Sequence, residues 1–101
     1  MKRTRRIPAD RKADLLNAAL HLARSQGYRT VTRDAIAEHA GVTPALVSHY
    51  LGTMPQLRRA IMSAAIARSE LAIIAQGLVA GDSKARAVTP EIKRRALESM
   101  L

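Results

Sequence analysis

The sequence predicts an all-α fold, and three of its features carry that prediction. Apolar residues recur at steps of three and four along most of the chain, the spacing that places side chains on one face of a helix. Threonine–proline pairs and single glycines divide the chain where helices begin and end. No segment alternates polar and apolar residues as a strand would. We therefore predict a unit of three helices, followed by a longer fourth helix and a short C-terminal helix.

The first helix is predicted over residues 9–26. Pro8 suits the first turn, where the backbone N–H groups have no partner within the helix, and Asp10 lies at the positive end of the helix dipole. Gly27 supplies a C-terminal stop. The apolar stripe of this helix consists of Ala13, Leu16, Ala19, Leu20 and Ala23.

Two short helices follow. Thr32 can cap the first of them, and Gly41 ends it. The inner face of this helix consists of Ile36, Ala37 and Ala40. Thr43 and Pro44 then begin the next helix as an N-cap hydroxyl followed by a residue without an N–H, and Gly52 ends it.

A fourth helix is predicted to begin at the capping box of Thr53 and Gln56, in which each side chain bonds the backbone of the other residue. It is predicted to run to Gln76 or Ala80. Its apolar face consists of Leu57, Ile61, Ala64 and Ala65, then Leu71, Ile74 and Ala75.

The remaining chain predicts a loop and one more helix. Residues 81–88 are small, polar and charged, which is typical of a loop. Thr89 and Pro90 repeat the pairing of cap and proline, so a final helix is predicted over residues 91–100.

The two short helices meet in the pattern of a helix-turn-helix. Their close crossing needs a small residue on the first helix, and Ala37 supplies it. The turn needs a residue that adopts a positive φ, and Gly41 does so without steric cost. Val42 and Val47 can anchor the second helix against the core.

The composition restricts the class of partner. The 101-residue chain carries 17 Lys and Arg against 8 Asp and Glu, a net charge of +9. Such an excess indicates a polyanionic partner, either nucleic acid or an anionic membrane surface.

The start, MKRTRRIPADRK, has no apolar stretch behind it and is not a secretory signal. The most apolar window, residues 60–80, contains Arg68 and Glu70 and predicts a soluble helix, so we expect no membrane association and a cytoplasmic location at the nucleoid.

No enzymatic site is predicted. The chain contains no cysteine, which excludes a disulfide framework, a thiolate metal site and a thiol nucleophile. His21, His39 and His49 are dispersed and have no carboxylate pattern beside them. No glycine-rich phosphate loop is present. We therefore expect no cofactor, no metal and no enzyme activity.

The run TRDAIAEHAGVTPALVSHYLGTMPQL resembles the DNA-binding half of the tetracycline-repressor (TetR-like) family. The resemblance covers about residues 9–65. The positions that fit its common pattern are Thr32, Ile36, Ala37, Ala40, Gly41, Val42, Thr43, Val47, Tyr50, Thr53 and Leu57. It implies a helix-turn-helix DNA-binding domain.

The chain departs from the family pattern at three positions. Ser48 and Leu51 stand where the family usually has aromatic residues, and Met54 stands where a lysine commonly grips a phosphate. Arg58 and Arg59 either replace that lysine or belong to a solvated face. The family also carries a long helical ligand-binding domain, whereas residues 66–101 leave little room for an effector cavity. A small-molecule ligand is therefore not expected.

The resemblance also implies roles for individual residues. Thr43 would bond a phosphate at the N-terminus of the second short helix, where the dipole and free N–H groups favour anions. Thr32 would lie against a phosphate, and Arg33 would contact the backbone or a base. Tyr50 either contacts the DNA backbone or closes the core. The residues implied to face the major groove are Pro44, Ala45, Ser48 and His49.

The sequence thus divides into a basic arm (1–8), a DNA-binding domain (9–65) and a short helical dimerisation region (66–101). Lys2, Arg3, Arg5 and Arg6 in the arm either enter the minor groove or remain a solvated tail. The residues expected to pair two copies are Leu71, Ile74, Leu78, Val79, Ile92, Ala96 and Leu97.

We expect a transcriptional repressor that binds an inverted-repeat operator in double-stranded DNA as a homodimer. Two alternatives remain. The chain could be a protein-interaction adaptor whose basic helices bind an acidic partner, or a basic amphipathic protein at a membrane surface.

Overall fold

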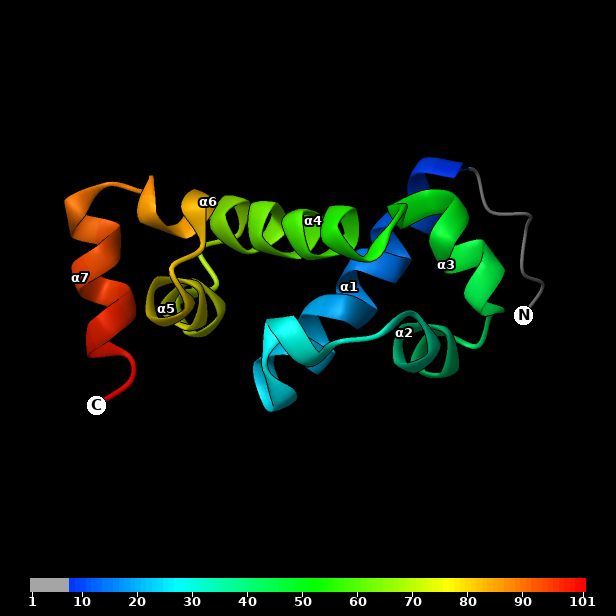
Figure 1. Ribbon diagram of the computed structural model, residues 1–101, viewed down its shortest axis with the longest axis horizontal. Helices are drawn as coiled ribbons and strands as arrows, with labels where there is room; N and C mark the ends of the chain where they lie inside the picture. Colours follow the sequence, from blue (N-terminus) through cyan, green and yellow to red (C-terminus); the bar gives the residue numbers. More distant parts are fainter. Residues whose placement is uncertain (1–7) are drawn as a thin grey trace, which may run out of the picture.

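A computed structural model describes residues 8–101, which contain helices and no strand. The helices are α1 (Pro8–Gln26), α2 (Arg33–Ala40), α3 (Pro44–Leu51), α4 (Met54–Ala67), α5 (Leu71–Ala80), α6 (Ser83–Arg86) and α7 (Pro90–Glu98), with a 3-10 turn, η1 (Tyr28–Thr30), after α1. The molecule measures 44 × 27 × 21 Å; α2 and α3 lie at one end, α5 to α7 at the other, and α4 joins them (Figure 1). Over this described part, no helix is both long and apolar enough to pass through a bilayer.

The predicted helix starts are confirmed by their caps. The hydroxyls of Thr32, Thr43, Thr53 and Thr89 each accept a hydrogen bond from the backbone N–H three residues on, at 3.1, 3.3, 3.3 and 3.2 Å. The Gln56 carboxamide oxygen accepts in return from the Thr53 N–H at 2.9 Å, which completes the predicted capping box. These local bonds satisfy N–H groups that the helices leave without partners, so each helix begins where its cap stands.

The core lies between α1 and the helices around it. Leu20, Ile36, Val47 and Ile61 are fully buried there. The buried face of α1 differs from the predicted stripe: Leu15 is buried, whereas Ala13 and Leu16 are half-buried. The reason is that α1 packs against α2, α4 and η1 together, so more than one side of it is covered.

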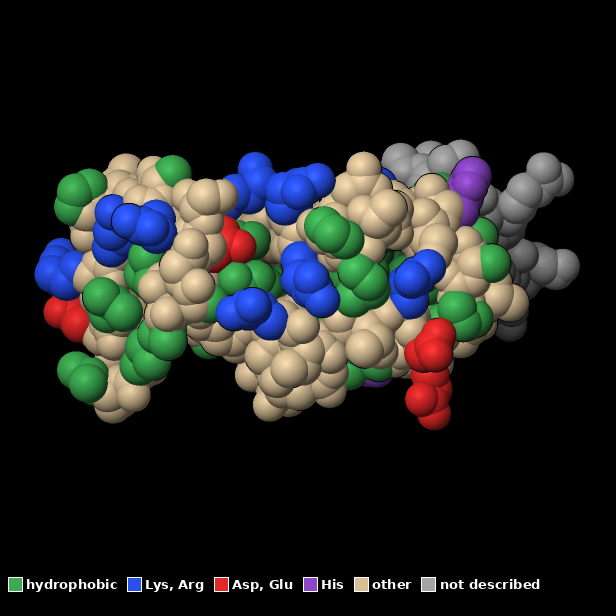
Figure 2. All heavy atoms as spheres, in the orientation of Figure 1, with side chains coloured by type: hydrophobic (Ala, Val, Ile, Leu, Met, Phe, Trp, Pro, Cys, Tyr) green, Lys and Arg blue, Asp and Glu red, His purple; other side chains and the backbone are tan. Residues whose placement is uncertain are grey.

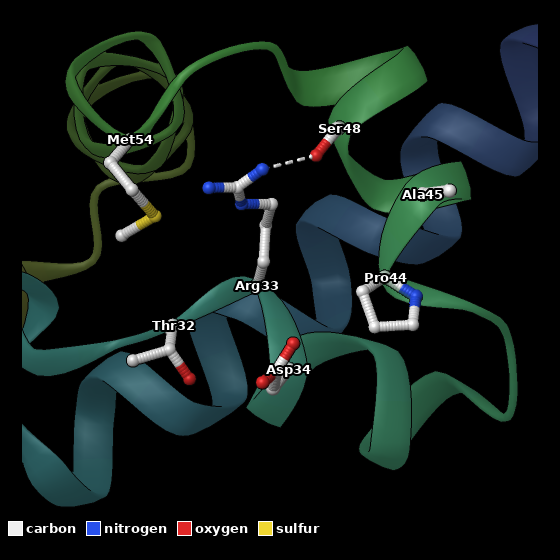
Figure 3. A pocket seen from close by; sticks show the side chains of 7 residues that line it. All are labelled: Thr32, Arg33, Asp34, Pro44, Ala45, Ser48 and Met54. Atoms are coloured by element: carbon white, nitrogen blue, oxygen red, sulfur yellow. Dashed lines mark hydrogen bonds between the residues drawn. The ribbon is translucent and has the colours of Figure 1, made fainter.

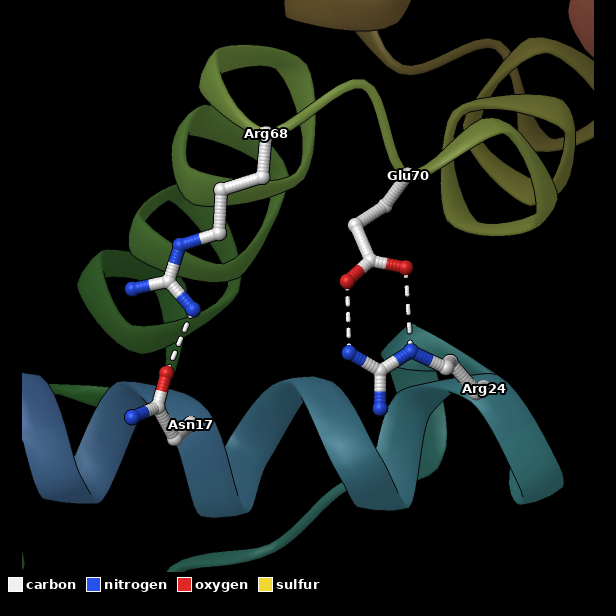
Figure 4. Close-up of polar contacts among 4 residues, drawn as sticks. All are labelled: Asn17, Arg24, Arg68 and Glu70. Carbon is white, nitrogen blue, oxygen red and sulfur yellow. Dashed lines mark hydrogen bonds and ion pairs between the residues drawn. The ribbon is translucent and has the colours of Figure 1, made fainter.

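The predicted long fourth helix is divided in two. α4 ends at Ala67, and Ser69 adopts a left-handed φ of 55° before α5 begins. The Arg24 guanidinium, on α1, binds both carboxylate oxygens of Glu70 at 2.9 and 2.5 Å, and Arg68 donates to the Asn17 side chain (Figure 4). The residues on both sides of the break are thus held to α1, and the chain turns there without a glycine or a proline.

The predicted loop over residues 81–88 contains the short helix α6. The Asp82 carboxylate caps it by accepting from the N–H groups of Lys84 and Ala85, at 2.9 and 3.1 Å. Ala85 is fully buried, so α6 forms part of the core. α5 continues past Gly77, where an added Cβ would lie only 2.7 Å from the Ala85 Cβ. The glycine therefore allows α5 and α6 to pack closely.

Gln76 joins α5 to the end of α1. Its carboxamide accepts a hydrogen bond from the Tyr28 N–H at 2.8 Å and donates one to the Ala23 carbonyl at 2.9 Å. The Tyr28 hydroxyl donates to the Asp82 carboxylate at 3.1 Å. Burial raises the pKa of Tyr28, and the charge of Asp82 raises it further. Gln76 in α5 and Asp82 at the start of α6 are thereby bonded to the end of α1 and to η1.

Candidate nucleic-acid interface

α2 and α3 form the predicted helix-turn-helix. Gly41 ends α2 with a left-handed φ of 73°, and the Val42 N–H donates to the Ala37 carbonyl at 3.0 Å, which closes the turn. Ala37 is 2% exposed and Val47 is fully buried, so the small and apolar residues at the crossing lie where their spacing predicted. The turn therefore has one tightly determined geometry, and it fixes which side of α3 faces outward.

One side of α3 lines a surface hollow of about 360 Å³. Figure 3 shows side chains from the start of α2, from α3 and from the start of α4 around this hollow. Its lining residues are Thr32, Arg33, Asp34, Pro44, Ala45, Ser48 and Met54. Five of these residues were predicted from the sequence to contact DNA, whereas Asp34 and Met54 were not predicted as part of the site. We call this space the α2–α3 hollow.

Arg33 and Ser48 are joined across the α2–α3 hollow. The Arg33 Nη1 donates a hydrogen bond to the Ser48 hydroxyl at 2.7 Å, from the first turn of α2 to the middle of α3 (Figure 3). Among the described residues, this hydroxyl is the partner of Arg33, and no carboxylate forms an ion pair with it. The guanidinium is thus held in place by a neutral group, while the Asp34 carboxylate lines the same hollow without an ion pair to it.

His49 and Tyr50 lie on a different side of α3. They line a second hollow of about 330 Å³ together with Lys12 of α1 and Gln56 of α4. The two rings meet edge to face, with centroids 4.8 Å apart. Tyr50 is half-buried and packs against the core, while part of its ring faces the hollow. Lys12 was not predicted as a site residue.

Thr43 stands at the start of α3 with its hydroxyl engaged in the cap. Arg59 is exposed on α4, whereas Arg58 lies close enough to Tyr28 for its charge to lower the Tyr28 pKa against the larger effect of burial. Neither arginine lines the α2–α3 hollow, where Met54 occupies the start of α4. The basic arm with Arg3, Arg5 and Arg6 lies outside the described residues, so its entry into the minor groove stays a prediction.

The basic side chains are spread along the molecule. Figure 2 shows Lys and Arg over one whole face, from the end that carries α2 and α3 to the end that carries α7, with acidic side chains over α2. On this face of the described residues, the basic side chains are therefore not gathered at α3. Such a distribution attracts a polyanion at long range and leaves discrimination to the residues at the hollows.

The predicted dimerisation residues separate into two groups. Ile74 and Ala96 are fully buried within the chain, so they cannot contact a second copy, and their assignment was wrong. Leu71, Leu78 and Ile92 are half-buried against the core. By contrast, Val79 is 70% and Leu97 46% exposed.

Two further residues at this end were not predicted to be at the surface. Met100 is 57% exposed and Leu101 is fully exposed. Val79 and Met100 line an apolar hollow of about 440 Å³ between α5 and the end of the chain, together with Ala72, Ala75, Gln76 and Ser99. We call this surface the α5–α7 patch.

Comparison with known proteins agrees with the geometry of the helix-turn-helix. Residues 15–61 match the family model of the bacterial regulatory proteins of the tetR family. These residues form a helix-turn-helix domain that is similar to that of the TetR family. The match runs from α1 through α2 and α3 into α4. It includes every residue that lines the α2–α3 hollow, and every residue except Lys12 that lines the hollow beside His49 and Tyr50.

A curated relative supports the same assignment. The chain is 50% identical over 50 residues to the HTH-type transcriptional regulator BetI of Rhizobium meliloti (strain 1021), over 50% of this chain. The matched segment spans 24% of the length of BetI. No solved structure matches the chain significantly. The similarity to the TetR family therefore concerns the helix-turn-helix, and α5 to α7 lie outside the matched family model.

Proposed function

We propose that the protein is a TetR-like, sequence-specific transcriptional repressor that binds an inverted-repeat operator as a homodimer. The observation that carries the proposal is the two-sided character of α3. Val47 and Leu51 are buried on its inner side, whereas Pro44, Ala45 and His49 are exposed on its outer side. A helix supported in this way can enter the major groove with its outer residues against base edges.

Backbone phosphates would hold the domain in register. Thr43 begins α3 and Thr32 begins α2, and the free N–H groups and dipole of a helix N-terminus favour a phosphate. Lys12 lies beside the His49 and Tyr50 rings and would meet the DNA backbone at the other edge of α3. Such contacts position the protein, and the base contacts select the sequence.

The α5–α7 patch supports the proposed dimer. A single helix-turn-helix makes few contacts for a specific affinity, and a two-fold operator suits a two-fold protein. Val79 and Met100 are large apolar side chains that line an apolar hollow at the surface, and Leu97 on α7 is a further exposed apolar side chain. A second copy of the chain would cover them, in place of the buried residues first expected to pair.

Control would come from the concentration of the protein and not from an inducer. Ile73, Ile74 and Ala85 fill the space between α4, α5 and α6. The hollows described above lie at the surface and include the DNA-facing side of α3. As a regulator of bacterial type, the protein would act in the cytoplasm, at the nucleoid.

The test is a salt titration of binding to duplex DNA, first of random sequence and then of fragments selected by the protein. Ala45→Glu places a carboxylate on the exposed side of α3 and should weaken binding to selected DNA at least about tenfold, because a charge facing phosphates is repelled. Ala67→Glu makes the same chemical change at the exposed end of α4 and is the matched control. Equal binding by the two variants would contradict the proposed role of α3.

The remaining parts of the proposal have separate readouts. Val79→Asp should convert a dimer to a monomer in sedimentation, whereas Ala67→Glu should not; a wild-type chain that is monomeric throughout would contradict the dimer. Binding to heparin and random DNA alike, with no selected sequence, would favour the adaptor for an acidic partner.

A further inference from the structure

The bond between Arg33 and Ser48 gives the α2–α3 hollow a chemistry beyond general DNA binding. Arg33 is the first residue of α2, and its side chain crosses to α3, where Nη1 donates to the Ser48 hydroxyl at 2.7 Å (Figure 3). A guanidinium carries five N–H donors in a planar fork. Nη1 is therefore held against α3, and the N–H groups of Nε and Nη2 remain free to donate hydrogen bonds to a ligand.

We propose that the α2–α3 hollow receives the edge of a guanine, with Arg33 as the residue that reads it and Ser48 as the residue that positions Arg33. This inference rests on the proposed function, because it names the base that the same site selects. Ser48 was predicted to contact DNA itself, and the inference gives its hydroxyl a different task.

The chemistry of the fork favours guanine among the bases. Guanine presents two acceptors, O6 and N7, to the major groove, and a bidentate arginine matches both. Adenine presents one acceptor and one donor there, so the same fork would bring two donors together. Because Ser48 holds Nη1 through a neutral oxygen, the charge of Arg33 stays available to the guanine acceptors.

The surroundings of the fork favour a base over a phosphate. Asp34 lines the same hollow, and its carboxylate repels a phosphate group. The apolar walls are Pro44, Ala45 and Met54, which suit the edge of a neighbouring base or a thymine methyl group. Met54 also leaves the hollow without the phosphate-binding lysine that the family commonly has at this position.

The hydroxyl of Ser48 acts by restricting Arg33. An arginine side chain has many rotamers, and ordering it on binding costs free energy that a preformed bond reduces. Ser48 lies on α3, so the bond also couples the fork to the helix that enters the groove. Removing the hydroxyl should therefore weaken guanine discrimination while the fork itself remains.

The experiment selects DNA fragments from a random duplex library with the full chain, and then measures binding to the selected site and to versions with each guanine replaced by adenine. Arg33→Lys retains the charge and loses the fork, and should lower the discrimination at one guanine by about 5- to 150-fold. Ser48→Ala should lower it by about 2- to 12-fold, the value of one hydrogen bond, and Ser48→Thr should restore it. Arg94→Ala, an exposed change on α7, is the matched control.

A second probe removes the acceptor from the DNA instead of the donor from the protein. Replacing that guanine by 7-deazaguanine should weaken wild-type binding and leave the binding of Arg33→Ala, which has no side-chain donor, unaffected. Circular dichroism of each variant shows that its fold is retained, which is expected because Arg33 is exposed and Ser48 is half-exposed.

The outcomes separate the inference from the proposed function. A wild-type chain that shows no salt-dependent DNA binding would overturn both. Selective DNA binding in which Arg33→Ala keeps the guanine preference, or in which Ser48→Ala and Ser48→Thr behave alike, would overturn the inference and leave the proposed function standing. A uniform loss of affinity for all sequences in Arg33→Ala, with a smaller salt dependence, would show a phosphate contact and would also overturn it.

Discussion

Replacing Gln76 by alanine should destabilise the folded protein by about 2 kcal/mol, because two hydrogen bonds of about 0.5–1.5 kcal/mol each are lost together. The Gln76 carboxamide accepts from the Tyr28 N–H at 2.8 Å and donates to the Ala23 carbonyl at 2.9 Å. Both backbone groups lie where α1 ends; the Ala23 carbonyl also accepts from the Gly27 N–H at 2.9 Å, so the bond to the Tyr28 N–H is the one whose loss costs most. The higher helix propensity of alanine offsets only about 0.4 kcal/mol of this loss in folding stability.

The assay is urea unfolding followed by circular dichroism at one fixed protein concentration, since a dimer would make stability depend on concentration. For a chain of this size, a loss of 2 kcal/mol corresponds to a fall in Tm of roughly 8–16 °C. Gln26→Ala removes the same carboxamide from an exposed position on α1 and should change the free energy of unfolding by less than about 0.5 kcal/mol. If Gln76→Ala and Gln26→Ala unfold alike, the carboxamide does not hold α5 to α1, and the reasoning fails.

Three further predictions concern local features. The hydrogen-bonded Arg24 guanidinium lowers the pKa of Glu70 below its usual 4.5, so the pair stabilises the fold above that pH and ceases to do so as the pH falls through the lowered value. The difference in urea unfolding between wild type and Glu70→Gln should therefore be at most about 1 kcal/mol at pH ~7, for a partly exposed pair, and should shrink toward pH ~3; a constant difference would count against the ion pair. Gly77→Ala should lower stability by about 1 kcal/mol despite its better helix propensity, because the new methyl group meets the Ala85 Cβ. Thermal unfolding should show that Ala85→Gly restores part of this loss, and a stabilising Gly77→Ala would disprove the close approach. Thr43→Ala should cost about 1 kcal/mol in unfolding and weaken DNA binding, whereas Thr43→Ser should retain both; equal stability of the two variants would exclude the cap.

The sequence was sufficient for features whose causes are local. Thr32, Thr43 and Thr53 cap helices because each hydroxyl bonds an N–H three residues away, and such bonds need no other part of the fold. Gly41 ends α2 for a similar local reason. The α4–α5 break escaped prediction because it depends on Glu70 binding Arg24, which is 46 residues distant in the chain. A helix of four residues such as α6 is too short to show a periodic pattern.

The candidate site shows the same contrast between features that are determined locally and features that depend on tertiary contacts. Arg33 and Ser48 were singled out through the family resemblance, and the structure brings their side chains together. The bond itself was not predictable, since it depends on the angle at which α2 and α3 cross. Lys12 and Met54 enter the hollows from α1 and α4 through tertiary packing alone. The burial of Ile74 within the chain was likewise not predictable, because an apolar stripe on a helix does not show whether the protein's own core or a partner covers that stripe.

The way α3 is anchored has a consequence for how such a protein diversifies over evolution. Its fully or almost fully buried side chains are Val47 and Leu51, and the exposed positions Ala45 and His49 do not contribute to the core. Substitutions at the outer positions are therefore nearly free of a folding penalty, since changes at exposed positions usually alter stability by less than about 0.5 kcal/mol. A duplicated gene could acquire a new operator by changing a few codons of this helix, while the descendants keep the same scaffold.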